Sequence, residues 1–281
     1  MKKDIALFLG SGGARGYVHI GVIRELESQG YVIRSISGSS MGALVGGLYA
    51  CGKLDEFEEW VTKLNPLDVL KLVDFTFGKS GFVKGDKVFD KIKDMVGKQK
   101  IEDLKIPFTA VATDLKKREE YLFAEGSLVE AIRASVAIPT MLTAVVHGER
   151  TLVDGGLCNP SGIVTPKDDS LFTVSVDLNA DIAVDSSYLK AKDKNPLQSK
   201  IEEFLASKVI DNNSLGLLEI IQESIETMQK IIAGAHLEET RPDLTIAISS
   251  ELCSFYDFHR AQELIEYGRK TAHDVLGNIN E

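Results

Sequence analysis

Residues 38–42, Gly38-Ser39-Ser40-Met41-Gly42, decide the fold, because they separate a run that predicts a strand from a small-residue run that predicts a helix. They fit the pattern G-x-S-x-G, in which the central serine occupies a strand-to-helix turn too tight for side chains beside it. Such a turn lifts the hydroxyl to a helix N-terminus, where free N–H groups favour developing negative charge. Ser40 is therefore predicted to be a nucleophile, supported by Gly38 and Gly42.

The segments before this turn alternate between strand and helix patterns. The apolar run 4–9 predicts a buried strand, residues 17–29 carry apolar side chains at helical spacing, and residues 31–37 predict a second strand. A strand–helix–strand–helix start is typical of a parallel sheet with helices on its faces. The predicted fold class is α/β, with a parallel-rich central sheet sandwiched by helices.

The same patterns continue along the rest of the chain. We expect a single domain over residues 1–281, with a core at about 4–180 and a C-terminal helical part at about 195–281 packed on it. Strands are predicted at 107–115, 121–123, 145–153 (a hairpin), 171–177 and 244–248, and helices at 127–136, 197–233 and 257–276.

A glycine-rich turn, Gly10-Ser11-Gly12-Gly13-Ala14-Arg15-Gly16, follows the first strand. Glycines permit positive φ and close approach of the backbone, so successive N–H groups can converge on an anion. A dinucleotide site is one interpretation, but the sixth position of its G-x-G-x-x-G pattern is Arg15, and no acidic residue ends the second strand. The favoured interpretation is an oxyanion hole formed by the amides of Gly12, Gly13 and Ala14.

A third motif, Asp154-Gly155-Gly156, follows the apolar run 151–153. An aspartate at a strand end, followed by two glycines, can project into a site against closely packed backbone. Asp-Gly alone is a common turn signal. Together with the turn at Ser40, the motif makes Asp154 a candidate partner for that serine.

Composition limits the classes of partner. The 281 residues carry a formal net charge of −10, which disfavours nucleic acid, because binding to it needs clustered cations. Cys51, Cys158 and Cys253 form neither a disulfide framework nor a zinc pattern, and the histidines do not cluster with carboxylates, so no metal site is expected. Sparse cysteines favour a reducing, cytoplasmic compartment.

No transmembrane segment is predicted. The longest uncharged stretch, 35–52, contains five glycines and four serines, and fits a strand end, a turn and a buried helix. Peripheral contact with a lipid surface is expected through an apolar segment at 65–85, although helix core is the competing interpretation there. The apolar side chains of that segment are Leu67, Val69, Leu70, Leu72, Phe75, Phe77 and Phe82.

In their order along the chain, the three motifs resemble the patatin-like phospholipase family in its compact bacterial form. The stretches Ala110–Leu115, Ala134–Pro139 and Pro242–Leu244 are also similar to that family, and the resemblance covers roughly residues 5–270. Each motif is unspecific alone, whereas the set of three is specific.

The resemblance implies a reaction and roles for particular residues. Ser40 would be the nucleophile and Asp154 its base, in a dyad without histidine. The amides around Gly12 and Gly13 would form the oxyanion hole, and Arg15 would steady their loop. The family's fold is related to the catalytic domain of cytosolic phospholipase A2. Its usual reaction is hydrolysis of acyl esters in phospholipids, lysophospholipids or neutral lipids, without a cofactor.

An aspartate with an ordinary pKa near 3.9 is a poor base for an alcohol. The site should therefore be apolar enough to raise the pKa of Asp154. Ile138, Pro139, Met141 and Leu142 are the candidates for that apolar wall.

Two positions depart from the family's pattern. Ser11 stands where many members have glycine, and Ser161-Gly162 follows Asn159-Pro160 where a small apolar residue and proline are common. We expect the second departure to reshape the rim beside the dyad, so it bears on substrate choice more than on reaction type.

Alternatives to the dyad hydrolase stay open. One is an α/β-hydrolase in which Ser40 works with a later aspartate and with His259 or His273. Only one strand is predicted before the strand that precedes Ser40, whereas that fold usually has several there. A second alternative is a non-catalytic patatin-like module used for binding, and a nucleotide-binding domain is the third.

Overall fold

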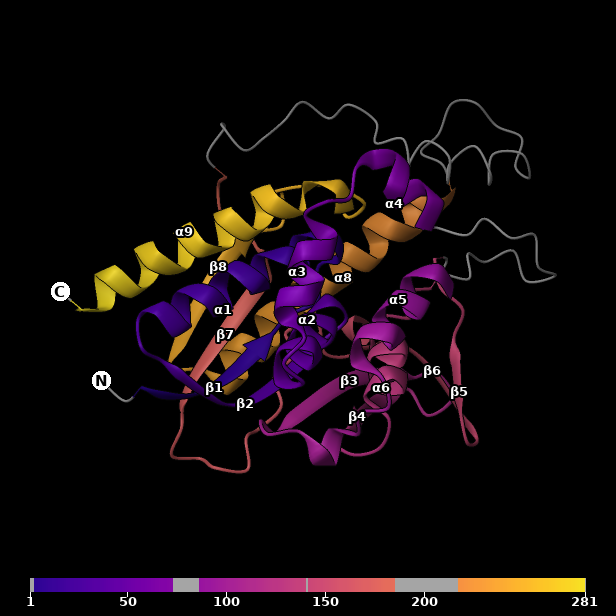
Figure 1. Ribbon diagram of the computed structural model, residues 1–281, viewed down its shortest axis with the longest axis horizontal. Helices are drawn as coiled ribbons and strands as arrows, with labels where there is room; N and C mark the ends of the chain where they lie inside the picture. Colours follow the sequence, from indigo (N-terminus) through magenta and orange to yellow (C-terminus); the bar gives the residue numbers. More distant parts are fainter. Residues whose placement is uncertain (1–2, 73–85, 140, 185–216, 281) are drawn as a thin grey trace.

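A central sheet of eight strands organises the chain in the computed structural model, which describes residues 3–72, 86–139, 141–184 and 217–280. The strand order is β5-β6-β3-β2-β1-β7-β8, and β4 pairs with β3 off this path. Figure 1 shows the sheet with helices around it. The strands are β1 (Asp4–Leu9), β2 (Val32–Ser39), β3 (Phe108–Asp114), β4 (Glu119–Phe123), β5 (Val145–His147), β6 (Arg150–Asp154), β7 (Phe172–Ala180) and β8 (Leu244–Ser249).

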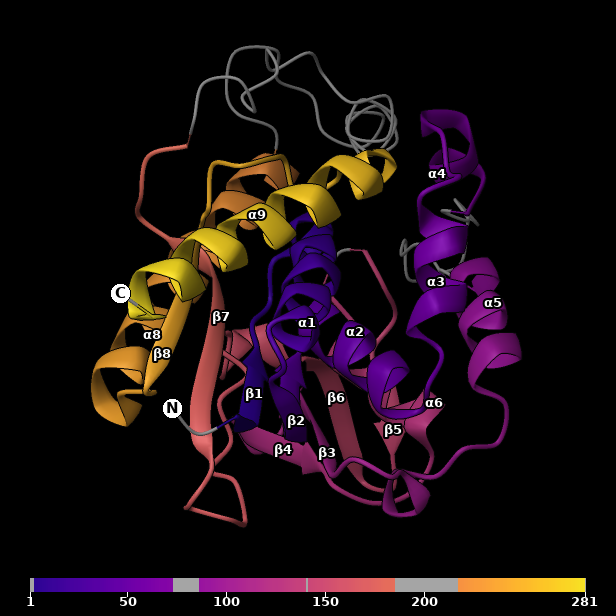
Figure 2. The ribbon, with the colours of Figure 1, turned by 60° about the vertical axis from the view of Figure 1, so that its left-hand side comes forward.

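Helices cover both faces of the sheet, as predicted for the α/β class. In Figure 2, α1, α2 and α9 lie in front of the sheet and α8 lies behind it. The arrangement follows from right-handed crossovers, because the chain moves from β1 towards β3 on one side and from β1 towards β8 on the other. The helices are α1 (Val18–Ser28), α2 (Met41–Ala50), α3 (Leu54–Val61), α4 (Pro66–Leu72), α5 (Asp86–Val96), α6 (Leu128–Ser135), α8 (Leu217–Thr240) and α9 (Ala261–Asn280).

Five successive strands are parallel: β3, β2, β1, β7 and β8 pair in that direction. The predicted strand at 121–123 is β4, and the predicted hairpin at 145–153 is β5 with β6; both add antiparallel pairs at one side. The predicted strand at 244–248 is the edge strand β8, so the C-terminal part contributes to the sheet as well as to the helical layers.

The register on β3 brings two chain ends together. β2 pairs with β3 as far as Ser39↔Val111, and β6 begins its pairing at Asp154↔Ala112. β4 pairs with all the residues from Ala110 to Asp114, so it occupies one edge of β3 and leaves the other to β2 and β6. The ends of β2 and β6 therefore meet head to head on one edge, beside consecutive residues of β3.

Close packing of α1 against α9 fixes the C-terminal region on the first βα unit. A Cβ on Gly21 of α1 would lie 1.9 Å from the Ile265 carbonyl oxygen, and one on Gly268 of α9 would lie 2.3 Å from the Val18 carbonyl oxygen. Buried Glu25 of α1 adds a hydrogen bond to His273 of α9. The loop between β8 and α9 is thereby held near the start of α1.

Among the described residues, no helix is long and apolar enough to cross a bilayer. The predicted lipid-contacting segment is described only to residue 72, as α4, where Leu67 is exposed and Val69 is buried. Its Phe75, Phe77 and Phe82 lie outside the described residues, as does the part of the predicted 197–233 helix before residue 217.

Candidate active site

The turn from β2 into α2 has the tight geometry that its sequence predicts. Ser40 adopts φ 54° and ψ −124°, in a region that non-glycine residues rarely occupy. A Cβ on Gly38 would lie 2.5 Å from the Gly42 carbonyl, and one on Gly42 would lie 2.0 Å from the Leu9 carbonyl oxygen. Both glycines are therefore required by the close approach of the backbone in this turn.

Ser40 and Asp154 are in direct contact. The Ser40 hydroxyl donates a hydrogen bond of 2.6 Å to Asp154 Oδ2, while Oδ1 accepts the Gly156 N–H at 2.7 Å. Both side-chain positions are buried, each residue being 2 % exposed. Gly155 is needed here because a Cβ on it would lie 2.2 Å from the Val111 carbonyl oxygen.

Burial raises the pKa of Asp154 to about 7, and the hydrogen bonds from Ser40 and Gly156 oppose that rise only in part. The residues expected to form an apolar wall beside Asp154 do not share one apolar cluster. Ile138 and Met141 pack into an apolar cluster with Val69, Phe255 and Tyr256. Leu142 instead packs against the main core, and Pro139 is half-buried.

The anion loop, residues 10–16, lies at the C-terminal end of β1. Gly13 has φ +53°, and Phe255 ring atoms come within 2.5–2.8 Å of the position that a Cβ on it would take. The Ala14 amide, predicted among the oxyanion donors, already donates to the Phe255 carbonyl at 3.0 Å. Within the described part of the chain, no hydrogen bond engages the Gly12 or Gly13 amide, so these two are the available donors.

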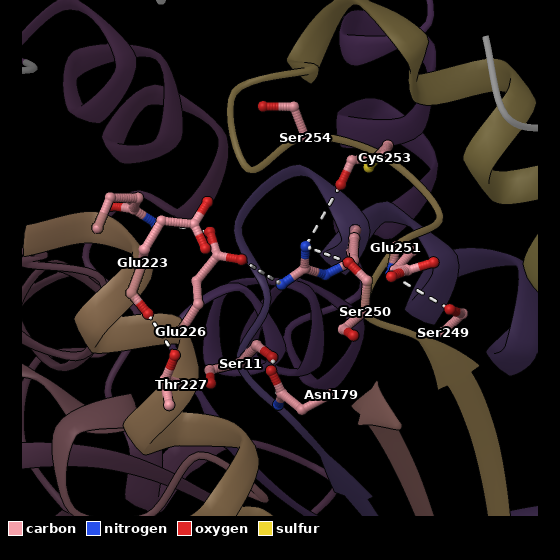
Figure 3. A network of polar contacts seen from close by, with 12 residues as sticks. Ser11, Asn179, Glu223, Glu226, Thr227, Ser249, Ser250, Glu251, Cys253 and Ser254 are labelled. Carbon is pink, nitrogen blue, oxygen red and sulfur yellow. Dashed lines mark hydrogen bonds and ion pairs between the residues drawn. The ribbon is translucent and has the colours of Figure 1, made fainter. Parts of the chain in front are cut away.

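Arg15 connects the anion loop to the far end of the chain. Its guanidinium is almost completely buried and donates to the carbonyls of Ser250 at 2.9 Å and Cys253 at 3.3 Å. It also lies 3.8 Å from Glu226 of α8. Figure 3 shows these contacts converging from α8 and from the loop after β8. The loop 250–253 is thereby tied to the segment that carries Gly12 and Gly13.

Neither of the two sequence departures lies exposed at a rim. Ser11 is buried, and its N–H donates to the Pro160 carbonyl at 2.7 Å. Ser161 is also buried and donates to Asn159 Oδ1. Gly162 has φ +67°, and a Cβ on it would lie 2.4 Å from the Leu9 carbonyl oxygen. Residues 159–162 therefore pack beneath the anion loop.

Four of the five histidines contact groups outside the dyad. His19 contacts the Gly10 carbonyl at 2.8 Å, and burial lowers its pKa to about 4. The ring nitrogens of the other histidines with described partners contact side chains elsewhere: His147 contacts Glu130, His236 contacts Ser161, and His273 contacts Glu25. The group bonded to the Ser40 hydroxyl is the Asp154 carboxylate.

Two structural contacts had no counterpart in the sequence analysis. The Ser135 hydroxyl accepts the Ser40 N–H, and Phe255 lies over Gly13. Ser135 lies within the family-like stretch 134–139, which is the one signal that pointed to it. Among the described residues, no three or more His, Cys, Asp or Glu side chains are grouped so that they could hold a metal ion.

Comparisons with known proteins agree with the three motifs. Residues 7–165 match the patatin-like phospholipase family. The NTE family protein Mb1092c of Mycobacterium bovis is 33% identical over 97% of this chain and 91% of its own length. Neuropathy target esterase sws of Drosophila virilis is 31% identical over 56% of this chain and 11% of its own.

A solved structure, VipD from Legionella pneumophila, aligns with 98% of this chain and 67% of its own at a TM-score of 0.49 and 10% identity. The family match covers more than half of the chain, and the M. bovis relative extends over nearly all of it. The chain therefore belongs to the patatin-like phospholipase family.

Proposed function

We propose that the protein is a serine acyl-ester hydrolase that acts on lipids, with Ser40 as nucleophile and Asp154 as its base. The observation that carries the proposal is the 2.6 Å hydrogen bond from the Ser40 hydroxyl to Asp154 Oδ2. It joins a hydroxyl on a strained turn to a buried carboxylate whose pKa is raised to about 7. A base is most effective when its pKa lies near the working pH.

In the acylation step, Asp154 takes the proton of Ser40 as Oγ bonds to the acyl carbon. The carbonyl oxygen becomes an oxyanion, which the Gly12 and Gly13 amides stabilise. The carbon–oxygen bond to the leaving group then breaks, and Asp154 gives its proton to the departing alcohol. Water next loses a proton to Asp154 and attacks the acyl-enzyme, and Ser40 regains that proton when the fatty acid leaves.

Family membership supports a lipid hydrolase, and the name of the Drosophila relative describes an esterase. Ester-linked acyl chains of phospholipids, lysophospholipids or neutral lipids are the proposed substrate class. We also propose that all 281 residues form one patatin-like domain that works in the cytoplasm and meets lipid surfaces peripherally. Leu67 of α4, 63 % exposed beside buried Val69, supports that contact.

Two measurements test the proposed reaction. A fluorophosphonate probe should label the parent protein at Ser40, and purified protein should release fatty acid from a panel of acyl esters. Ser40→Ala should abolish both, whereas Ser28→Ala, at the exposed end of α1, should leave both unchanged. Labelling that persists in Ser40→Ala would assign the nucleophile to another residue. A parent protein that neither labels nor hydrolyses any ester would favour the non-catalytic binding module.

A further inference from the structure

The strained backbone of Ser40 requires support from outside its own turn. A non-glycine residue in such a region is strained and persists only where its surroundings fix it. The Ser40 N–H lies beyond the last β2–β3 pair, Ser39↔Val111, and before the first residue of α2. Neither the sheet ladder nor the helix therefore supplies its hydrogen-bond acceptor.

Ser135, the last residue of α6, supplies that acceptor. Its hydroxyl oxygen accepts the Ser40 N–H at 2.9 Å and donates its own proton to the Val111 carbonyl at 2.6 Å. The side chain is completely buried. The hydroxyl thus links Ser40, directly after the end of β2, to Val111 in the middle of β3, at the point where β2 turns away from β3.

The segment that contains Ser135 also holds Asp154. The Ala137 carbonyl accepts the Asp154 N–H at 3.0 Å, and the Thr113 hydroxyl donates to the Asp154 carbonyl at 2.8 Å. Ser135, at the end of α6, therefore fixes the backbone of Ser40, and Ala137, two residues beyond it, fixes that of Asp154 together with Thr113 of β3. A shift of this segment would change the distance between the reacting oxygens.

We propose that Ser135 is a positioning residue for the hydrolysis proposed above, on which this inference rests: its hydroxyl holds the Ser40 backbone so that Oγ stays within hydrogen-bonding distance of Asp154. This role has a second consequence. Because the Ser40 N–H is bonded to Ser135, it does not stabilise the oxyanion, and the Gly12 and Gly13 amides carry that task.

Ser135→Ala tests the inference. It removes both hydrogen bonds, so Ser40 can relax away from its strained conformation. A displacement of about 1 Å can lower a rate about 100-fold. We expect the fluorophosphonate labelling rate and kcat to fall by about that factor while KM changes little, because the lost interaction acts on the reacting atoms and not on bound substrate.

Ser175→Ala in β7 is the matched control. Ser175 is also a completely buried serine, and its hydroxyl has no hydrogen-bond partner among the described residues. We expect its labelling rate and kcat to equal those of the parent. A purely structural role for Ser135 would lower the unfolding temperature and leave the labelling rate of the folded protein unchanged, which would overturn the inference.

Two further variants complete the test. Ser135→Thr keeps the hydroxyl, so its labelling rate should return to most of the parent value. A labelling rate no higher than that of Ser135→Ala would overturn the inference. If Ser135→Ala does not fold, Ser135→Cys replaces it, since the longer sulfur contact should displace Ser40 and slow labelling. Labelling of Ser135→Cys at the parent rate would again overturn it. Ser40→Ala, run in parallel, separates this failure from failure of the proposed function itself.

Discussion

The two halves of the site are built in different ways. The dyad corner (Ser40, Asp154 and residues 135–137) is held by three adjoining strands and one helix end, within residues 36–156. The anion loop is held by contacts with residues 160, 176 and 250–255, far away in the sequence. Its Arg15 is a buried cation whose ion-pair partner, Glu226, is partly exposed. The position of the dyad corner therefore depends on neighbouring strands, whereas the position of the anion loop depends on contacts with the C-terminal region.

The largest expected effect is at the dyad corner. Asp154→Asn keeps the shape of the side chain and removes the base, so the fluorophosphonate labelling rate should fall about 10²–10⁴-fold. Asp4→Asn, which breaks an exposed ion pair with Arg34, should leave the labelling rate unchanged. A dyad hydrolase could not account for labelling of Asp154→Asn at the parent rate.

Asp154→Asn should also make the folded protein more stable at neutral pH, because the parent's Asp154 has a raised pKa in the folded state. In the folded state Asp154 keeps its proton until the pH approaches its raised pKa of about 7. In the unfolded state it loses the proton near the ordinary aspartate pKa of 3.8. The contribution of this group to stability is therefore complete below pH 4, and it is lost as the pH rises to 7. Chemical unfolding should show Asp154→Asn increasingly more stable than the parent between pH 4 and 7, with a constant difference above.

The anion loop should respond differently, with rate and stability falling together. In Gly13→Val, the new side chain would clash with the Phe255 ring, and valine is strained at the positive φ of this position. The backbone amide of residue 13 would therefore move. Loss of one oxyanion donor lowers a rate about 10²–10³-fold, and we expect labelling to fall by about 100-fold. Thermal unfolding should begin at a lower temperature than in the parent.

Gly97→Val is the control for this prediction. Gly97 has φ +66°, close to that of Gly13, but no atom lies within 4 Å of the position of its Cβ. It should lose stability through backbone strain and keep the parent labelling rate. If Gly13→Val also kept that rate in a folded protein, the loop would be an ordinary turn between β1 and α1.

The local turns of the site could be predicted from the sequence, whereas the contacts between distant residues could not. The turn at Ser40, the loop at Gly13 and the Asp-Gly-Gly turn are local patterns in which glycine has a steric reason, so their positions are predictable. That Ser40 meets Asp154 depends on which residues of β3 each neighbouring strand uses, and no local pattern encodes that register. The hydrogen bond from the Ala14 N–H to the Phe255 carbonyl joins residues that are even further apart in the sequence. Nothing in the sequence therefore indicated that this amide, predicted as an oxyanion donor, has another acceptor.

The pH dependence of the parent sharpens the assignment of the base. With a pKa of about 7, Asp154 is mostly protonated in acid and cannot accept the Ser40 proton. The value of kcat/KM should therefore rise about tenfold per pH unit below 7 and level off above it. Asp154→Asn should lose this dependence in its residual activity. A parent profile that is flat between pH 5 and 8 would assign the base to another group.

The smallest effects should come from the histidines, and they separate the dyad from a Ser-His-Asp triad. Changed singly to Gln, His147, His236, His259 and His273 should each keep labelling within about threefold of the parent, since a positioned base is worth about 10²–10⁴ and none of them would be that base. His19 lies on the anion-loop side and contacts the Gly10 carbonyl, so His19→Gln should lower stability more than the other four do. Labelling lost in folded His259→Gln or His273→Gln, but kept in Asp154→Asn, would replace the dyad with the triad. The C-terminal region would then supply the base, the dyad corner would supply only the nucleophile, and the histidine variants would show the largest effects.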